Sequence, residues 1–198
     1  MIHSVRSRTA CSMTLLAVAL TLGTVGCAQS ARSPYSSTNV AVQRDTVLAR
    51  ELYAKVQRLD PDEREEAERL LRECLVADLY HGPAHNNLGV ILLDRGVLYE
   101  AANEFEWARK LMPGHPAPRV NLAMTLERAG RFDDAISAYD AALAVFDGHL
   151  PAIQGKARLQ IRSGRVDETT LAMLDEISLR GDDDWREWAR LWRMKLGH

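Results

Sequence analysis

The 198-residue sequence has few of the residues that mark specialised classes of protein. Its three cysteines are too few for a disulfide framework, and its seven prolines and twelve glycines exclude collagen-like and low-complexity chains. Lys and Arg (25) nearly balance Asp and Glu (27), so the strong basic excess typical of nucleic-acid-binding domains is absent and no nucleic-acid partner is expected. Hydrophobic residues make up 46% of the chain, which is ample for a folded core.

The first 26 residues have the organisation of an export signal. Arg6 and Arg8 precede an apolar stretch over 14–22, which is shorter than the roughly 20 residues of a membrane-spanning helix. The stretch ends in Thr24-Val25-Gly26-Cys27, which resembles the lipobox of bacterial lipoproteins. The resemblance implies that residues 1–26 are removed and that Cys27 carries the lipid that anchors the protein in a membrane. The alternatives are an ordinary secretory signal cleaved after Ala28, or a retained anchor.

The segment that follows has the composition of a linker. Residues 27–45 are rich in Ser, Thr and Asn, include Pro34 and have no apolar periodicity. This composition predicts a flexible tether between the lipid and a folded domain, with a short extended segment packed on the domain as the alternative.

The rest of the chain repeats every 34 residues. Gly96, Gly130 and Gly164 have this spacing, and so do His81, His115 and His149. The same period relates two further sets of positions, which are Ala67, Ala101 and Ala135, and Leu71, Phe105, Tyr139 and Met173. A fixed period of this length is the signature of a repeat architecture.

Each unit has the pattern of two helices joined by a tight turn. Apolar pairs at i, i+4, such as Leu88 and Leu92, share one face of a helix. The repeated glycines stand where the first helix must end, because glycine adopts the left-handed C-cap conformation at little cost. In the second helix, Ala101, Phe105 and Ala108 alternate small and large side chains, which favours close helix packing.

The unit over 83–115 resembles a tetratricopeptide repeat (TPR), because Leu88-Gly89, Leu92, Ala101, Phe105, Ala108 and Pro113 occupy that family's positions, with His85 where the family often has Trp. The resemblance covers residues 46–196. It implies an all-α solenoid of about four helix-turn-helix repeats, over about 48–81, 82–115, 116–149 and 150–180. Asp182-Asp183-Asp184 followed by Trp185, Trp188 and Trp192 predicts a capping helix over 182–196, with a membrane-interface helix as the alternative.

The sequence indicates no catalytic residues, cofactor or metal site. The three histidines lie one repeat apart, so they form a row with roughly 10 Å between members, whereas zinc ligands sit roughly 2 Å from one metal. A metal protein or enzyme that uses His81, His85, His115 and His149 is the alternative. Cys74 is expected to be an inert thiol inside the core.

The resemblance further implies that the first helices line a concave groove that holds a protein or peptide partner. Asn87 and Asn121 occupy the position where family members often use Asn to bond the ligand backbone. Val90, Met124 and Arg158 form a neighbouring row, and a second row consists of Asp60, Asp94, Arg128 and Arg162. The second row changes from acidic to basic and favours a partner of opposite polarity; alternatively, it only keeps an exposed face soluble.

These expectations combine into a non-catalytic, lipid-anchored scaffold or adaptor in the bacterial cell envelope. Ala28 stands where inner-membrane lipoproteins often carry Asp, which favours the outer membrane, with the domain facing the periplasm. A pilus or secretin assembly lipoprotein and a self-assembling structural protein of the envelope are the alternatives.

Overall fold

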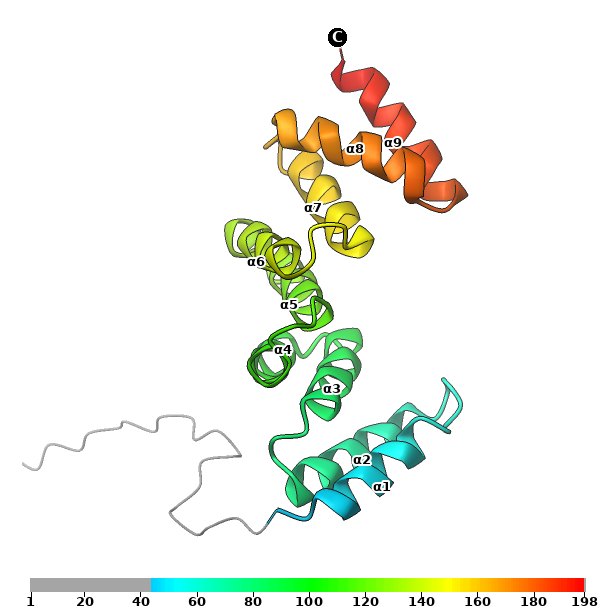
Figure 1. Ribbon diagram of the computed structural model, residues 1–198, viewed down its shortest axis with the longest axis vertical. Coiled ribbons are helices and arrows are strands. Elements are labelled where there is room, and N and C mark those ends of the chain that lie inside the picture. The colour runs from blue at the N-terminus through cyan, green and yellow to red at the C-terminus, as the bar shows by residue number, and fades with distance from the viewer. Residues whose placement is uncertain (1–43, 198) are drawn as a thin grey trace, which may run out of the picture. The chain divides into compact units, whose positions relative to one another are not determined.

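A computed structural model describes residues 44–197 of the chain, and in this range it contains nine α-helices and no strand (Figure 1). The predicted signal peptide, Cys27 and most of the predicted tether lie outside the described residues. The helices are α1 (Thr46–Val56), α2 (Arg64–Ala77), α3 (Gly82–Asp94), α4 (Leu98–Leu111), α5 (Ala117–Arg128), α6 (Phe132–Val145), α7 (Leu150–Arg162), α8 (Glu168–Arg180) and α9 (Asp183–Leu196).

Each helix packs against the next along the chain, and α5 also contacts α3 and α7. In Figure 1, α3, α5 and α7 lie to the right of α4 and α6, so the first and second helices of successive pairs form two layers. Among the described residues, no helix combines the length and the apolar character needed to cross a bilayer. The predicted all-α solenoid of helix pairs is confirmed.

The three repeated glycines end the first helices, as the 34-residue period predicts. Gly96, Gly130 and Gly164 have φ of 78°, 76° and 69°, in the left-handed region that side-chain-bearing residues rarely adopt. At the first turn, the Gly96 N–H donates to the carbonyl of Leu93, and the Val97 N–H donates to that of Leu92. A Cβ added at any of the three glycines would meet nothing within 4 Å. Glycine is therefore required here by the backbone angle and not by lack of space.

The second helices bury the small and aromatic side chains that the pattern assigned to the core. Ala101, Phe105 and Ala108 of α4 are fully buried, and so are the corresponding Ala135, Tyr139 and Ala142 of α6. Phe105 lies so close to α3 that a Cβ on Gly89 would be 2.7 Å from its ring. Burying each large apolar side chain of this kind contributes about 1.5–3 kcal/mol.

These buried side chains form three successive core clusters. The first joins α1 to α4 and includes Leu122 of α5, the second joins α5, α6 and α7, and the third joins α7, α8 and α9. Each of the second and third clusters thus spans the boundary between one helix pair and the next.

The helical domain includes Arg44 and Asp45, which the sequence analysis assigned to the tether. The Asp45 side chain accepts from the N–H of Leu48 at 2.9 Å and so caps α1, and its own N–H donates to the carbonyl of Ala77. Arg44 donates two hydrogen bonds, of 2.8 and 3.0 Å, to the carboxylate of Asp78. This guanidinium holds the pKa of Asp78 below its ordinary value. Local capping and a bidentate ion pair therefore fix these two residues.

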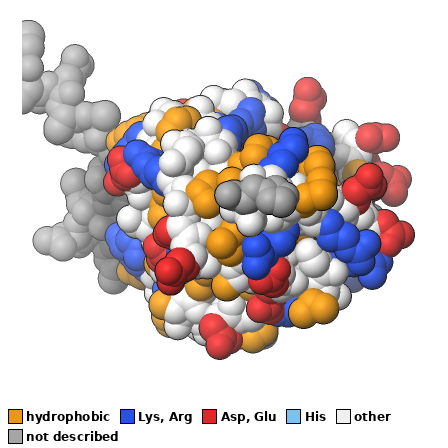
Figure 2. Space-filling model, turned by 90° about the horizontal axis from the view of Figure 1, so that it is seen from above, with side chains coloured by type: hydrophobic (Ala, Val, Ile, Leu, Met, Phe, Trp, Pro, Cys, Tyr) orange, Lys and Arg blue, Asp and Glu red, His pale blue; other side chains and the backbone are white. Residues whose placement is uncertain are grey.

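The last helix covers the third core cluster. Asp182 begins α9 by accepting from the N–H of Trp185 at 3.0 Å, and Ala189 is fully buried. Trp185, Trp188 and Trp192 pack against the third cluster, and the first two rings meet edge to face at 5.1 Å. Figure 2, which views the molecule onto this end, shows hydrophobic side chains and Lys or Arg side chains close together.

Candidate functional site

The residues predicted to bind a partner lie on one side of the first helices, which we call the first-helix face: Asn87, Val90, Asn121, Met124, Arg128, Arg158 and Arg162. Positions three, four and seven residues apart share one face of a helix, and the three helices α3, α5 and α7 are neighbours. Val90 and Met124 are 37% and 40% exposed, and the Arg158 side chain is 44% exposed. This row is therefore accessible to a partner.

A cavity of about 320 Å³ opens at the N-terminal end of this face, between the turn from α1 to α2 and helix α3. Asn87, Val90 and Asp94 line it from α3, and Asp60 and Glu63 line it from the turn. The structure thus brings together Asn87, Val90 and the acidic pair Asp60 and Asp94, which the resemblance to TPR proteins had assigned to the groove. Across the opening, Arg64 of α2 pairs with Asp94 at 2.6 Å.

The two predicted asparagines belong to a ladder of hydrogen bonds that crosses three first helices. Asn87 Nδ2 donates to the Tyr53 hydroxyl at 3.1 Å, and Asn121 Nδ2 donates to Asn86 Oδ1 at 3.0 Å. A longer bond of 3.4 Å, from Asn86 Nδ2 to Asn87 Oδ1, connects the two parts. Each amide offers two donors and one acceptor oxygen, so these bonds leave capacity for a ligand backbone.

At the C-terminal end of the face, two of the predicted arginines converge on one buried carboxylate. Arg162 Nη1 and Arg158 Nη2 lie 2.9 and 3.2 Å from the carboxylate oxygens of Glu127, which is 8% exposed. The Tyr139 hydroxyl donates to the same carboxylate at 3.4 Å, and burial, followed by the charge of Glu127, raises the pKa of Tyr139. Arg128 donates to the carbonyl of Leu93 at 2.6 Å.

The charge of the first-helix face changes sign along the stack. The cavity end carries three carboxylates against one guanidinium, whereas Arg128, Arg158 and Arg162 lie toward the opposite end, where Glu127 pairs with the last two. The sequence analysis anticipated this polarity but missed Asn86 and Glu127 of the first helices, and the bond from Tyr139 of α6 to Glu127. The sequence feature that could have identified Asn86 and Glu127 is a separation of about one repeat from their partners. Asn86 precedes Asn121 by 35 residues, and Glu127 precedes Arg158 by 31.

His81 and His85 occupy a capping and a packing position. His81 Nδ1 accepts from the N–H of Ala84 at 3.1 Å and caps α3. His85 is fully buried, with Nδ1 2.6 Å from Glu104 and Nε2 2.8 Å from the carbonyl of Leu79. Over residues 44–197 no group of three His, Cys, Asp or Glu side chains is placed to hold a metal ion.

Cys74 is a fully buried thiol, as predicted. Its Sγ donates to the carbonyl of Ala49 at 3.2 Å, within the first core cluster. Burial, reinforced by the negative charge of Asp78, raises the pKa of Cys74 to about 11. A thiol of this kind is not a nucleophile at neutral pH.

Comparison of the sequence with family models finds a match over residues 13–184 to the family described as the Protein kinase G tetratricopeptide repeat. The match begins inside the predicted signal peptide and covers most of the chain. No curated protein matches the sequence significantly.

Solved structures with the same arrangement of helices include the first TPR of Spaghetti (RPAP3) bound to the HSP90 peptide SRMEEVD. It is 14% identical with a TM-score of 0.58, and the alignment covers 62% of this chain and 98% of that one. MamA is 18% identical with a TM-score of 0.59, covering 65% and 75% of the two chains. A TPR protein of Parabacteroides merdae is 19% identical with a TM-score of 0.61; there the alignment covers 73% of this chain and 58% of the other. At these identities the likeness concerns the fold.

Proposed function

Because the chain belongs to the Protein kinase G tetratricopeptide repeat family, we propose that it is a non-catalytic scaffold that binds a segment of another protein on its first-helix face. The TPR fold is a scaffold for protein–protein interaction, and the observation that carries the proposal is the change of charge along this face. Asp60 and Asp94 lie at one end, and Arg128, Arg158 and Arg162 lie at the other.

This polarity selects the orientation of a partner segment. A segment with an acidic end and a basic end is attracted in one direction only, because the reversed direction places like charges together. The peptide SRMEEVD in the Spaghetti complex carries two Glu and one Asp against one Arg, so a similar fold holds an acidic peptide. The exposed Val90 and Met124 supply apolar contact between the charged ends.

The test is an affinity capture from solubilised bacterial envelopes with matched variants. Val90→Glu and Met124→Glu place a charge on the first-helix face at exposed positions and break no hydrogen bond that holds the fold. Val76→Glu and Leu179→Glu are the controls, because these side chains are 78% and 81% exposed on α2 and α8. We expect one partner to be retained by the wild type and the controls and lost by the first pair. Retention by all four variants contradicts the proposal.

A second capture tests the charges separately. Arg158→Gln and Arg162→Gln remove positive charge while leaving Glu127 a hydrogen-bond donor at each position. We expect weaker capture and a smaller decrease with added salt than in the wild type, because fewer ion pairs form in the complex.

We also propose that the scaffold is anchored by a lipid on Cys27 in the cell envelope, in the outer membrane facing the periplasm. The lipobox-like sequence before Cys27 and Ala28 after it support this placement. Labelling cells with a palmitate analogue tests this placement. The wild type and Cys11→Ser should be labelled and should sediment with outer membranes. Cys27→Ser should not be labelled and should not sediment with them. The identity of the captured partner then decides whether a role in pilus or secretin assembly holds.

A second candidate function, self-assembly, is favoured by the outer side of α9. Leu191 and Met194 are 43% and 62% exposed there, beside Arg186 and Arg190. Light scattering across a concentration series should show larger particles for the wild type than for Leu191→Glu/Met194→Glu if this side joins molecules. A constant molar mass rejects it.

A further inference from the structure

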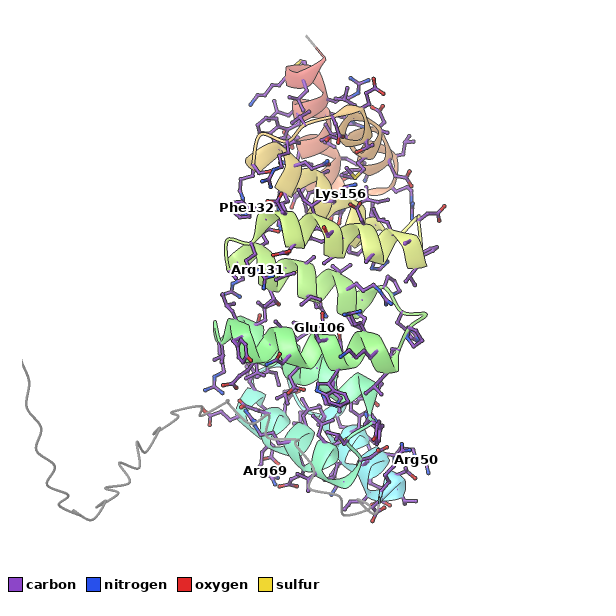
Figure 3. All side chains as sticks on the ribbon, turned by 90° about the vertical axis from the view of Figure 1, so that its left-hand side faces the viewer. Arg50, Arg69, Glu106, Arg131, Phe132 and Lys156 are labelled. Atoms are coloured by element: carbon purple, nitrogen blue, oxygen red, sulfur yellow. The ribbon has the colours of Figure 1, made fainter. Side chains whose placement is uncertain are left out.

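A second hollow lies on the side of the second helices, between α4 and α6, with α5 as its floor. Its volume is about 460 Å³. Leu122 and Leu126 of α5 form the floor, and Ala102 of α4 and Ala138 of α6 also line it. Small residues at these two positions leave the space open. Figure 3 views the molecule from this side, with Glu106 on α4 and Arg131 next to the start of α6. We call this hollow the second-helix groove.

One end of the second-helix groove carries guanidinium groups whose bonding is incomplete. Arg109 pairs through Nη2 with Glu106 at 2.5 Å, but its Nε atom is buried and has no hydrogen-bond partner. A buried donor without an acceptor is costly and rare in folded proteins. Arg119 lines the same groove, and its Nη1 donates to the carbonyl of His115 at 3.0 Å. Within the described part of the chain, Arg119 forms no ion pair with a carboxylate.

At the other end of the second-helix groove, the charged side chains form an ion pair. Arg131 pairs with Asp134 at 2.7 Å, and both side chains are more than half exposed. The groove is thus apolar along its floor, neutral at one end and positively charged at the other, where Arg119 lacks a carboxylate partner among the described residues. This asymmetry specifies the chemistry of an occupant: apolar side chains followed by a carboxylate.

We propose that the second-helix groove binds an acidic amphipathic segment of a partner protein, with its apolar side chains over Leu122 and Leu126 and a side-chain carboxylate against Arg109 and Arg119. The carboxylate forms charge-assisted hydrogen bonds with the free donors of Arg119 and lies beside the positive charge of Arg109. This function is independent of the first-helix face. A scaffold with both surfaces holds two protein segments, one on each layer of helices.

The test uses the purified full chain and a fluorescent eight-residue peptide of Leu, Glu and Ala, blocked at both ends so that its only carboxylates are those of Glu. Fluorescence anisotropy measures its dissociation constant. In one control peptide every Glu is replaced by Gln, and in the other every Leu is replaced by Ala. We expect each control peptide to bind at least about tenfold more weakly, the effect of losing one charged hydrogen bond or one buried apolar side chain.

The protein variants locate the site. Arg119→Glu reverses a charge of the groove, and Ser137→Trp places a bulky ring on its rim, where Ser137 is exposed. Arg50→Glu is the matched charge reversal on α1, away from the groove (Figure 3). We expect Arg119→Glu and Ser137→Trp to lose the peptide and Arg50→Glu to retain it, with all three unfolding at similar urea concentrations.

Three results overturn the proposal. One is that the wild type binds the Glu and Gln peptides equally or binds neither. Another is that Met124→Glu, on the first-helix face, loses the peptide while Ser137→Trp keeps it; that outcome leaves the proposed function standing and removes only this one. The last is that the wild type self-associates and Ser137→Trp does not, which assigns the groove to a second copy of the chain.

Discussion

The ring of Tyr139 fills the space that a side chain on Gly155 would need: a Cβ built at Gly155 would lie 2.5 Å from Tyr139 Cε1. Gly155 occupies in α7 the position that Asn87 and Asn121 occupy in α3 and α5. The hydrogen-bonded asparagines therefore end at α5, because α7 has no asparagine at this position. Between α5, α6 and α7 the packing contact is made by the Tyr139 side chain. Its hydroxyl reaches Glu127, which holds Arg158 and Arg162.

Gly155→Ala should lower the free energy of unfolding. Overpacking a buried site costs about 1–3 kcal/mol, which exceeds the gain of up to about 1 kcal/mol from alanine's higher helix propensity. Urea unfolding monitored by circular dichroism measures the difference. Gly114→Ala is the control, because a Cβ there meets nothing within 4 Å. Equal midpoints for the two variants contradict the role of the Tyr139 ring.

His81 should make stability depend on pH between about 7 and 5. Burial is the main cause that lowers the pKa of His81 from 6.5, so the unfolded chain binds a proton at a higher pH than the folded protein does. Stability is therefore full above the unfolded pKa and falls as pH decreases toward the folded pKa. Protonation also removes the Nδ1 acceptor that caps α3, a cap worth about 1 kcal/mol.

The measurement is urea unfolding at a series of pH values for the wild type, His81→Asn and His115→Asn. Asparagine keeps an N-cap acceptor and does not titrate, so His81→Asn should lose less stability between pH 7 and pH 5 than the wild type. His115 is exposed and serves as the matched control. An identical pH profile for wild type and His81→Asn is the result that excludes this cap as a proton-sensitive contact.

The buried pair of His85 and Glu104 should show strong coupling. Glu104→Leu removes the group 2.6 Å from His85 Nδ1, and His85→Leu removes the buried partner of the Glu104 side chain, so either change should cost about 3–5 kcal/mol. The double variant replaces both groups by apolar ones and should recover part of this loss. A double-mutant cycle in urea measures the coupling, and additive single effects would show that the pair is not coupled.

Cys74 should resist alkylation in the folded protein. Its pKa of about 11 leaves almost no thiolate at pH 8, and the side chain is fully buried. In a Cys11→Ser/Cys27→Ser background, mass spectrometry after iodoacetamide treatment should find little modification of Cys74 without urea and complete modification in urea. Fast labelling of the folded protein would place the thiol outside the core.

The sequence predicts the fold well because the features that define it are local and repeat. A left-handed glycine after α3, α5 and α7, an alanine–aromatic–alanine stripe in α4 and α6 and an aspartate before α9 each determine structure within a few residues. The grouping of Asn87, Val90 and Asp94 came from the resemblance to TPR proteins, and their spacing is consistent with one helix face.

The contacts that the sequence analysis missed depend on how neighbouring repeats lie against each other. In the sequence, Glu127 has the pattern of a polar residue on the exposed side of a helix. It is buried under two arginines because α7 packs against α5. The second-helix groove likewise depends on the distance between α4 and α6, which no local pattern reports. The burial of Arg109 Nε also results from tertiary packing.

The division of the interior into three core clusters has a mechanical consequence. Each cluster joins only consecutive helices, and the stability of such an array is approximately the sum of the units and their nearest-neighbour interfaces. A force that pulls the two ends of the chain apart meets these interfaces in series. The protein should therefore lengthen in separate steps, one cluster at a time, and shorten again in steps when the tension is released.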